Sequence, residues 1–263
     1  MNPFNFEFHK ELNPEVWDGD RLKPEVRKHL LGIAEKFVHY IGVPLEPVDV
    51  IFTGSLANYN YTEYSDIDLH ILVDKSAIGG SEAVPPQVFN ELFTAKKTLW
   101  NENHEIQIAG FDVELYVQDV NEMHASTGVY SVGNDEWVKK PSADDPKVDE
   151  ESVKMKAQSY MDMIDHALAQ EDCEAACLST IKEGIKGMRK AGLSAGGEFS
   201  TENLAFKALR RNGYIEKLLN AEREALDATL SLEALATDLV DSMLNEIAGD
   251  DVVVADEETQ SGS

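Results

Sequence analysis

Residues 51–74 read IFTGSLANYNYTEYSDIDLHILVD. An apolar run ends at Gly54-Ser55, a polar connector follows, and polar and apolar residues then alternate from residue 66 to residue 73. Successive side chains of a strand point to opposite faces, so this alternation is typical of a strand with one buried face. The pattern predicts a strand, a turn with a short helix start, and a second strand.

Alternation in the second strand places two carboxylates on one face. Its apolar residues would face the core, which leaves Asp66, Asp68 and His70 on the other side. Two carboxylates this close repel each other, and Mg²⁺ suits them because it prefers hard oxygen ligands and shares them with phosphates. Gly54 would let a phosphate approach the backbone, and the helix start and the Ser55 hydroxyl would donate to it. The alternative is an edge strand with two solvated aspartates and a turn glycine.

Gly-Ser, a ten-residue gap and Asp-x-Asp within a strand resemble the DNA polymerase β-like nucleotidyltransferase superfamily. The resemblance implies that Asp66 and Asp68 are catalytic carboxylates holding two Mg²⁺ ions, with help from a third carboxylate on a neighbouring strand. It also implies that Gly54 and Ser55 bind a nucleoside triphosphate. Residues 53–71 (TGSLANYNYTEYSDIDLHI) and 190–211 (KAGLSAGGEFSTENLAFKALRR) further resemble predicted bacteriophage nucleotidyltransferases.

The third carboxylate is expected in residues 111–119, FDVELYVQD. Asp112 and Glu114 share the polar face of this strand. Glu114 lies between two apolar strand residues and fits the superfamily pattern better, so it is preferred as the third metal ligand and catalytic group. Asp112, nearer the turn at Gly110, is the alternative.

A cluster of basic residues interrupts an otherwise acidic chain. Between residues 180 and 220 there are eight basic and four acidic residues, whereas the whole chain has a formal net charge of −26. Helical spacing would gather several of them on one surface, which suits the outer phosphates of a triphosphate. The alternative is a solvated helix face. The eight residues of this basic cluster are Lys182, Lys186, Arg189, Lys190, Lys207, Arg210, Arg211 and Lys217, of which Lys186, Arg189, Lys207 and Arg210 are predicted to bind the triphosphate.

The composition limits the partners of the chain. Extended binding to DNA normally needs a basic surface, so none is expected. No run of about 18 apolar residues indicates a membrane span, and residues 1–10 lack a secretory pattern. We therefore expect a cytoplasmic protein, in the host cytoplasm if phage-encoded, without a membrane partner. Cys173 and Cys177 are expected to be reduced core thiols.

Apolar periodicity predicts a mixed α/β fold, with a small sheet flanked by helices and then an all-helical region. Expected domains are a catalytic domain with an N-terminal arm at 1–147, a helical domain at 148–248 and an acidic disordered tail at 249–263. Expected helices cover 23–41, 87–103 (with Val88, Leu92, Ala95 and Leu99 on one side), 152–169, 174–191 (ending at Gly192), 203–219 (broken or bent at Gly213) and 230–247. Further strands are expected at 105–109 and 111–117, and residues 129–138 form either a hairpin or a plain surface connection.

The resulting hypothesis is a Mg²⁺-dependent nucleotidyltransferase. It would move a nucleoside monophosphate from a nucleoside triphosphate to an acceptor hydroxyl and release pyrophosphate. The acceptor is open among an RNA 3′ end, a protein hydroxyl, a small molecule such as an antibiotic and a second nucleotide. Two alternatives remain: a catalytically inactive nucleotide-binding or interaction protein of the same fold, and an acidic mimic of DNA.

Overall fold

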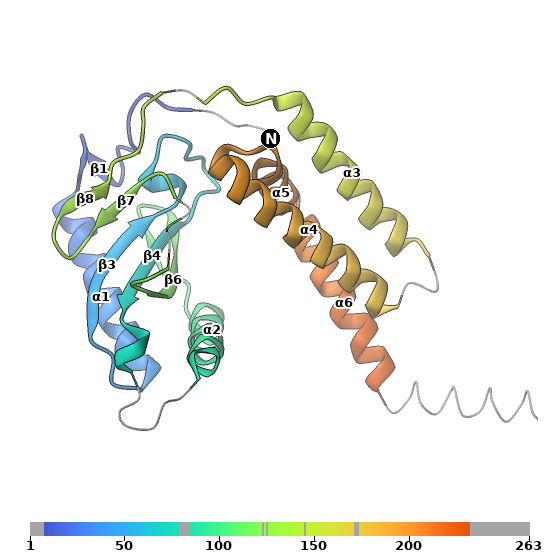
Figure 1. Cartoon of the computed structure of the whole chain (residues 1–263), viewed down its shortest axis with the longest axis horizontal. Helices are drawn as coiled ribbons and strands as arrows, with labels where there is room; N and C mark the ends of the chain where they lie inside the picture. The colour runs from blue at the N-terminus through green and yellow to red at the C-terminus, as the bar shows by residue number, and fades with distance from the viewer. Residues whose placement is uncertain are drawn as a thin grey trace, which may run out of the picture.

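A mixed sheet with helices on one face forms the first half of the chain, and a group of helices forms the second half (Figure 1). The structure, a computed structural model, describes residues 8–78, 85–122, 124, 126–144, 146–170 and 174–231. The first half contains β1 (Trp17–Asp18), β2 (Arg21–Leu22), α1 (Pro24–Ile41), β3 (Pro47–Thr53), η1 (Ser55–Ala57), β4 (Ile67–Val73), η2 (Lys75–Ala77), α2 (Pro86–Asn103), β5 (Gln107–Ile108), β6 (Phe111–Asp119), β7 (Val129–Ser131) and β8 (Glu136–Lys139). The second contains α3 (Glu150–Leu168), α4 (Ala175–Gly196), η3 (Gly197–Phe199), α5 (Thr201–Arg211) and α6 (Tyr214–Leu230). The predicted fold class is therefore confirmed.

The strands are ordered β5-β6-β4-β3-β7-β8. β4 pairs with β6 in parallel and with β3 antiparallel, and α2 lies in the crossover between the two parallel strands. The register sets Asp68 opposite Thr53 on one side and Glu114 on the other. The hairpin alternative for residues 129–138 is confirmed, because β7 and β8 pair with each other and β7 extends the sheet from β3.

Alternation in β4 buries one face and leaves the other for the site. Ile67, Leu69, Ile71 and Val73 are buried in the same hydrophobic cluster as the apolar faces of α1 and α2. The intervening positions of the strand are only partly buried. The apolar run therefore fixes which way the polar side chains of β4 point.

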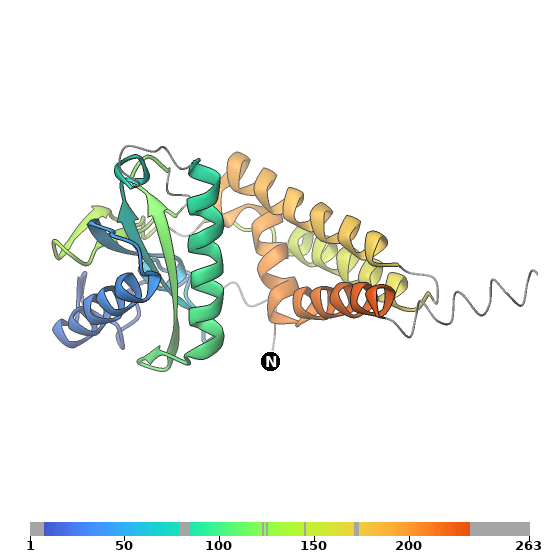
Figure 2. The ribbon, with the colours of Figure 1, turned by 90° about the horizontal axis from the view of Figure 1, so that it is seen from below.

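The helices α3 to α6 lie together beside the half that contains the sheet (Figure 2). They have a hydrophobic core of their own. Among the described residues, one hydrophobic cluster runs from residue 12 to residue 132 and a second from residue 153 to residue 218, and the proposed domain boundary at 147/148 lies between them. Gly213, at φ 74°, separates α5 from α6 as expected. No helix in the described ranges is long and apolar enough to span a membrane.

Several sequence predictions need correction. α2 buries Phe89, Phe93 and Trp100, whereas Val88 and Leu99 are about half exposed, because the bulky aromatic residues one position further along form the larger apolar stripe. Cys177 is exposed rather than in the core, and Cys173 lies outside the described residues. The predicted helix at 230–247 and the acidic tail also lie beyond the described residues, apart from Leu230, the last residue of α6, and Ser231.

Gly192 does not end α4, which continues to Gly196. A Cβ atom at residue 192 would lie 2.4 Å from Cβ of Glu202 and 2.8 Å from Oγ of Ser200. The glycine thus allows the start of α5 to pack closely against α4.

Replacing Gly192 by alanine should lower the free energy of unfolding by about 1–3 kcal/mol, because the new methyl group overlaps α5. Gly187→Ala in the same helix is the matched control, since no atom lies within 4 Å of the added methyl group. That variant should gain roughly 0.5–1 kcal/mol from helix propensity. Urea unfolding followed by circular dichroism measures both, and a gain at both positions would contradict the packing role of Gly192.

Candidate functional site

A cleft of about 390 Å³ lies between the polar face of the sheet and the helices α4 and α5. Its two walls differ in charge. The sheet, the connector before β4 and the segment after β6 supply carboxylates, imidazoles, hydroxyls and amides. The helical wall supplies the cations Arg189, Lys207, Arg210 and Arg211.

Asp66 and Asp68, placed by β4, both line this cleft. Burial raises the pKa of Asp68 to about 7, and the negative charges of Glu114 and Asp66 act in the same direction. Burial also raises the pKa of Asp66, which Arg210 opposes. Nη2 of Arg210 donates to Oδ2 of Asp66 at 2.7 Å. The ionised forms of both carboxyl groups are therefore destabilised by burial and by mutual repulsion, and a nearby cation stabilises them.

Gly54 meets the carboxylate of Asp68 directly. Its backbone, at φ 82° and ψ −167°, favours glycine, and a Cβ atom there would lie 1.8 Å from Oδ2 of Asp68. The Gly-Ser and Asp-x-Asp segments are thus parts of one packing unit. The expected helix start is only the single turn η1, so a helix dipole contributes little. The Ser55 hydroxyl lines the cleft and hydrogen-bonds the Ser65 hydroxyl at 2.8 Å.

Glu114 and Asp112 have different surroundings. Glu114 is the register partner of Asp68 and has Lys97 Nζ 3.6 Å from its Oε2. Asp112 accepts a hydrogen bond of 2.8 Å from Nε2 of Gln107 on the edge strand β5. Glu114 is therefore better placed than Asp112 to act together with Asp68.

The three carboxylates offer the oxygen donors that Mg²⁺ prefers. Asp66 and Glu114 are each paired with a cation instead, through Arg210 and Lys97. Within the described ranges, no three His, Cys, Asp or Glu side chains are already gathered at metal-binding distances. The donor set fits a divalent ion by its chemistry, and the two ion pairs would have to open to receive one.

The basic cluster is divided by the fold. Four of its members form the helical wall of the cleft, including Arg211, which was not among the predicted triphosphate ligands. Lys186 does not line the cleft: its side chain is 74% exposed and its Nζ lies 3.4 Å from Glu183. Lys182 and Lys217 are paired with Glu222 and Asp165. Helical spacing predicted a shared face, but only the packing of α4 on α5 decides which residues reach the cleft.

Lys207 is the cation without a direct partner. It forms no hydrogen bond or ion pair with any described residue, although it lines the cleft. Burial lowers its pKa, and the negative charges of Glu198 and Asp68 oppose that shift. A buried ammonium group without a direct partner is stabilised by any anion that enters the cleft.

Glu198 joins the two halves of the molecule and has no clear sequence signal. Its buried Oε1 accepts hydrogen bonds from Nδ2 of Asn58 at 2.7 Å, from the backbone N–H of Thr127 at 3.1 Å, and from the Thr127 hydroxyl. Its backbone carbonyl accepts from Nδ2 of Asn203 at 2.7 Å, and Oδ1 of Asn203 accepts from Nε of Arg189 at 3.3 Å. This network links the end of η1 to the cationic wall.

His70 lies two residues beyond Asp68 and lines the same cleft. Its Nδ1 is 2.6 Å from Oε1 of Gln118, and its Nε2 is 3.5 Å from the Thr53 hydroxyl. Burial lowers the pKa of His70 and that of His124, which also lines the cleft. These polar groups belong to the site, although the sequence pattern identified only His70 among them.

Comparison with known proteins adds little. No family model matches the chain, and no curated protein matches it. The STING-associated CdnE c-di-GMP synthase from Capnocytophaga granulosa is similar in structure, with 12% sequence identity and a TM-score of 0.24 over 76% of this chain and 84% of the other. At this TM-score the similarity supports no conclusion about the function of the present chain.

Asp68→Asn should stabilise the metal-free protein at pH 8 and leave it nearly unchanged near pH 4. The folded carboxyl titrates at about 7 and the unfolded one near 3.8, so the folded state binds more protons between these values. Stability is therefore lost as pH rises through this window, by up to about 4 kcal/mol, and a neutral asparagine avoids the loss. Thermal unfolding in EDTA measures it. Glu91→Gln, at an exposed site on α2, is the control, and an Asp68→Asn variant less stable than wild type at pH 8 would contradict the assignment.

Proposed function

We propose that the chain is a Mg²⁺-dependent nucleotidyltransferase, which moves a nucleoside monophosphate from a nucleoside triphosphate to an acceptor hydroxyl. One observation carries the proposal. Two carboxylates at the start of β4, Asp66 just before the strand and Asp68 within it, face four cationic side chains of α4 and α5 across a single cleft, and Asp68 packs on Gly54. Carboxylates that can share divalent ions with phosphates, opposite cations that can hold those phosphates, are what phosphoryl transfer requires.

Each group has a role in this proposal. Asp66, Asp68 and Glu114 would hold two Mg²⁺ ions, which would neutralise charge on the transferring phosphoryl group and orient the attacking oxygen. The Ser55 hydroxyl would donate to the triphosphate, and Gly54 would let the Asp68 carboxylate lie directly beside it.

The helical wall would bind the outer phosphates. Lys207 has no competing partner among the described residues, and Arg189 is held in place by Asn203 and by the ring of Phe206, 4.3 Å from its guanidinium carbon. Arg210 and Arg211 extend this wall toward Asp66 and Tyr64.

The chemistry is an in-line displacement. The acceptor oxygen forms a bond to the α-phosphorus, and the bond from that phosphorus to the bridging oxygen breaks. Pyrophosphate leaves with the bonding electron pair, and the hydroxyl proton passes to a carboxylate, for which Glu114 is the candidate. The cytoplasm, where nucleoside triphosphates and Mg²⁺ occur together, is the proposed place of action. The net charge of −26 favours a protein or small-molecule acceptor over long nucleic acid.

A labelling experiment tests this function. The protein is incubated with each α-labelled nucleoside triphosphate and Mg²⁺, and cellular RNA, protein extract or a small-molecule extract is added. We expect label to appear on one acceptor class with wild type, and not with Asp66→Asn or Asp68→Asn, because both variants lose a negative oxygen ligand while keeping their shape. The proposal fails if no nucleoside triphosphate binds in the presence of Mg²⁺, or if transfer persists in both variants.

Arg210→Gln should have opposite effects on two ligands. Without the guanidinium, Asp66 is free, so Mn²⁺ alone should bind several-fold more tightly. A Mg²⁺-nucleotide complex should bind about tenfold more weakly, because a charge-assisted contact to phosphate is lost. Paramagnetic resonance of Mn²⁺ and calorimetry of a non-hydrolysable nucleotide measure the two.

Arg223→Gln, at an exposed arginine of α6 outside the cleft, is the matched control and should change neither value. Weaker binding of both ligands to Arg210→Gln would show that Arg210 merely supports the local structure.

A further inference from the structure

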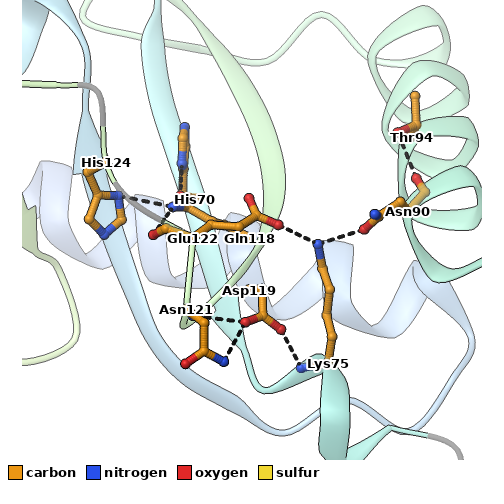
Figure 3. Close-up of polar contacts among 9 residues, drawn as sticks. All are labelled: His70, Lys75, Asn90, Thr94, Gln118, Asp119, Asn121, Glu122 and His124. Carbon is orange, nitrogen blue, oxygen red and sulfur yellow. Dashed lines mark hydrogen bonds and ion pairs between the residues drawn. The ribbon is translucent and has the colours of Figure 1, made fainter. Parts of the chain in front are cut away.

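Beyond Asp68 on the sheet side, the cleft is lined by three linked side chains, His70, Gln118 and His124, with the acidic Glu122 beside them. Figure 3 shows Gln118 between His70 and His124, with its amide contacting both rings. All three residues line the cleft, and Gln118 itself is only 4% exposed. Among the described residues that line it from the sheet side, none is a lysine or an arginine.

The orientation of the Gln118 amide follows from one contact. Its Nε2 lies 3.2 Å from the backbone carbonyl oxygen of Glu122, which can only accept a hydrogen bond. The NH₂ group must therefore face Glu122, and the carbonyl oxygen Oε1 must face His70.

This orientation fixes both imidazole tautomers. Oε1 of Gln118 accepts from Nδ1 of His70 at 2.6 Å, so His70 carries its proton on Nδ1 and has a lone pair on Nε2. Nε2 of Gln118 donates to Nδ1 of His124 at 3.2 Å, so His124 carries its proton on Nε2. The ring nitrogens that Gln118 does not contact are thus an acceptor on His70, which has only a long contact of 3.5 Å with the Thr53 hydroxyl, and a donor on His124.

Further contacts hold Glu122 in position. Nζ of Lys75 lies 2.8 Å from Oε1 of Glu122 and donates to Oδ1 of Asn90 at 2.8 Å. The Lys75 side chain is only 9% exposed, and its backbone N–H donates to Asp119 at 2.9 Å. The segment after β6 is therefore tied to η2 and α2 (Figure 3).

We propose that this tautomer-fixed pair, His70 and His124, binds the base of the nucleoside triphosphate, and that Gln118 is the positioning residue for base choice. The inference rests on the proposed function. The phosphates would lie between the cationic wall and the Mg²⁺ ions at Asp66 and Asp68, so the base would lie along the part of the sheet wall beyond these carboxylates. A base edge presents an N–H donor beside an acceptor, which complements the pair. The half-exposed ring of Tyr116, 5.2 Å from the His70 ring, offers a surface beside it.

Binding of the full-length protein to four non-hydrolysable nucleoside triphosphates and to inorganic tripolyphosphate, each with Mg²⁺, tests the proposal. Wild type should prefer one base by about tenfold, the worth of one or two well-placed hydrogen bonds. Gln118→Glu keeps the acceptor for His70 but removes the donor to His124, so the preference should fall to within about threefold. Tripolyphosphate has no base, and its affinity should change by less than about twofold.

Nitrogen NMR of ¹⁵N-histidine-labelled protein gives a second readout. Wild type should show the proton of His70 on Nδ1 and that of His124 on Nε2, and Gln118→Glu should lose the fixed state of His124. If Gln118→Glu does not fold, His124→Leu, at a cleft-lining side chain, replaces it and should lower the base preference in the same way.

Four results would overturn the inference: equal affinity of wild type for all four bases, an unchanged preference in the variant, an equal loss of tripolyphosphate binding, or the opposite tautomers. Failure of the proposed function looks different, because neither the nucleotides nor tripolyphosphate would then bind with Mg²⁺.

Discussion

The carboxylate of Asp68 leaves no room for a side chain at residue 54, and the organisation of the site depends on that contact. The antiparallel register of β3 and β4 sets Thr53 opposite Asp68, and the chain then turns at Gly54 beneath the carboxylate. The parallel register of β4 and β6 sets Glu114 on its other side. The Asp68 carboxylate is thereby buried close to the negative charges of Asp66 and Glu114. Its environment is unfavourable unless a cation is supplied.

Two cations from different helices stabilise the negative charges of these carboxylates. Arg210 reaches Asp66 from α5, and Lys97 reaches Glu114 from α2. Lys207 adds its charge near Asp68 without a direct bond. The cationic wall is therefore both a counter-charge for the sheet and a surface that favours anions. Its position in turn depends on Glu198. The Glu198 carboxylate hydrogen-bonds Asn58 at the end of η1 and Thr127 in the segment before β7.

The sequence predicts the sheet side of the site better than the helical side, for physical reasons. Alternation around Asp66 and Asp68 is a local pattern, and burial of the apolar face determines where the carboxylates point. Helical spacing put Lys186 and Arg189 on one face, but only Arg189 lines the cleft, because the packing of α4 on α5 decides which residues reach it.

Long-range contacts explain the remaining differences. In α2 two overlapping apolar stripes exist, and only contact with α1 and the sheet selects Phe89 and Trp100 over Val88. Glu198 acts through partners distant in the chain, and Gln118 acts through the orientation of its amide. Neither effect can be predicted from the spacing of residues in the sequence.

The hydrogen bond between Arg210 and Asp66 joins residues 144 positions apart. A ribosome has therefore synthesised the whole sheet well before the counter-charges of α5 leave the exit tunnel. During that interval the nascent chain has acidic groups crowded at β4 without the wall that balances them. An incomplete chain of this protein would thus lack the cationic wall, so truncated or stalled products would not form the complete cleft.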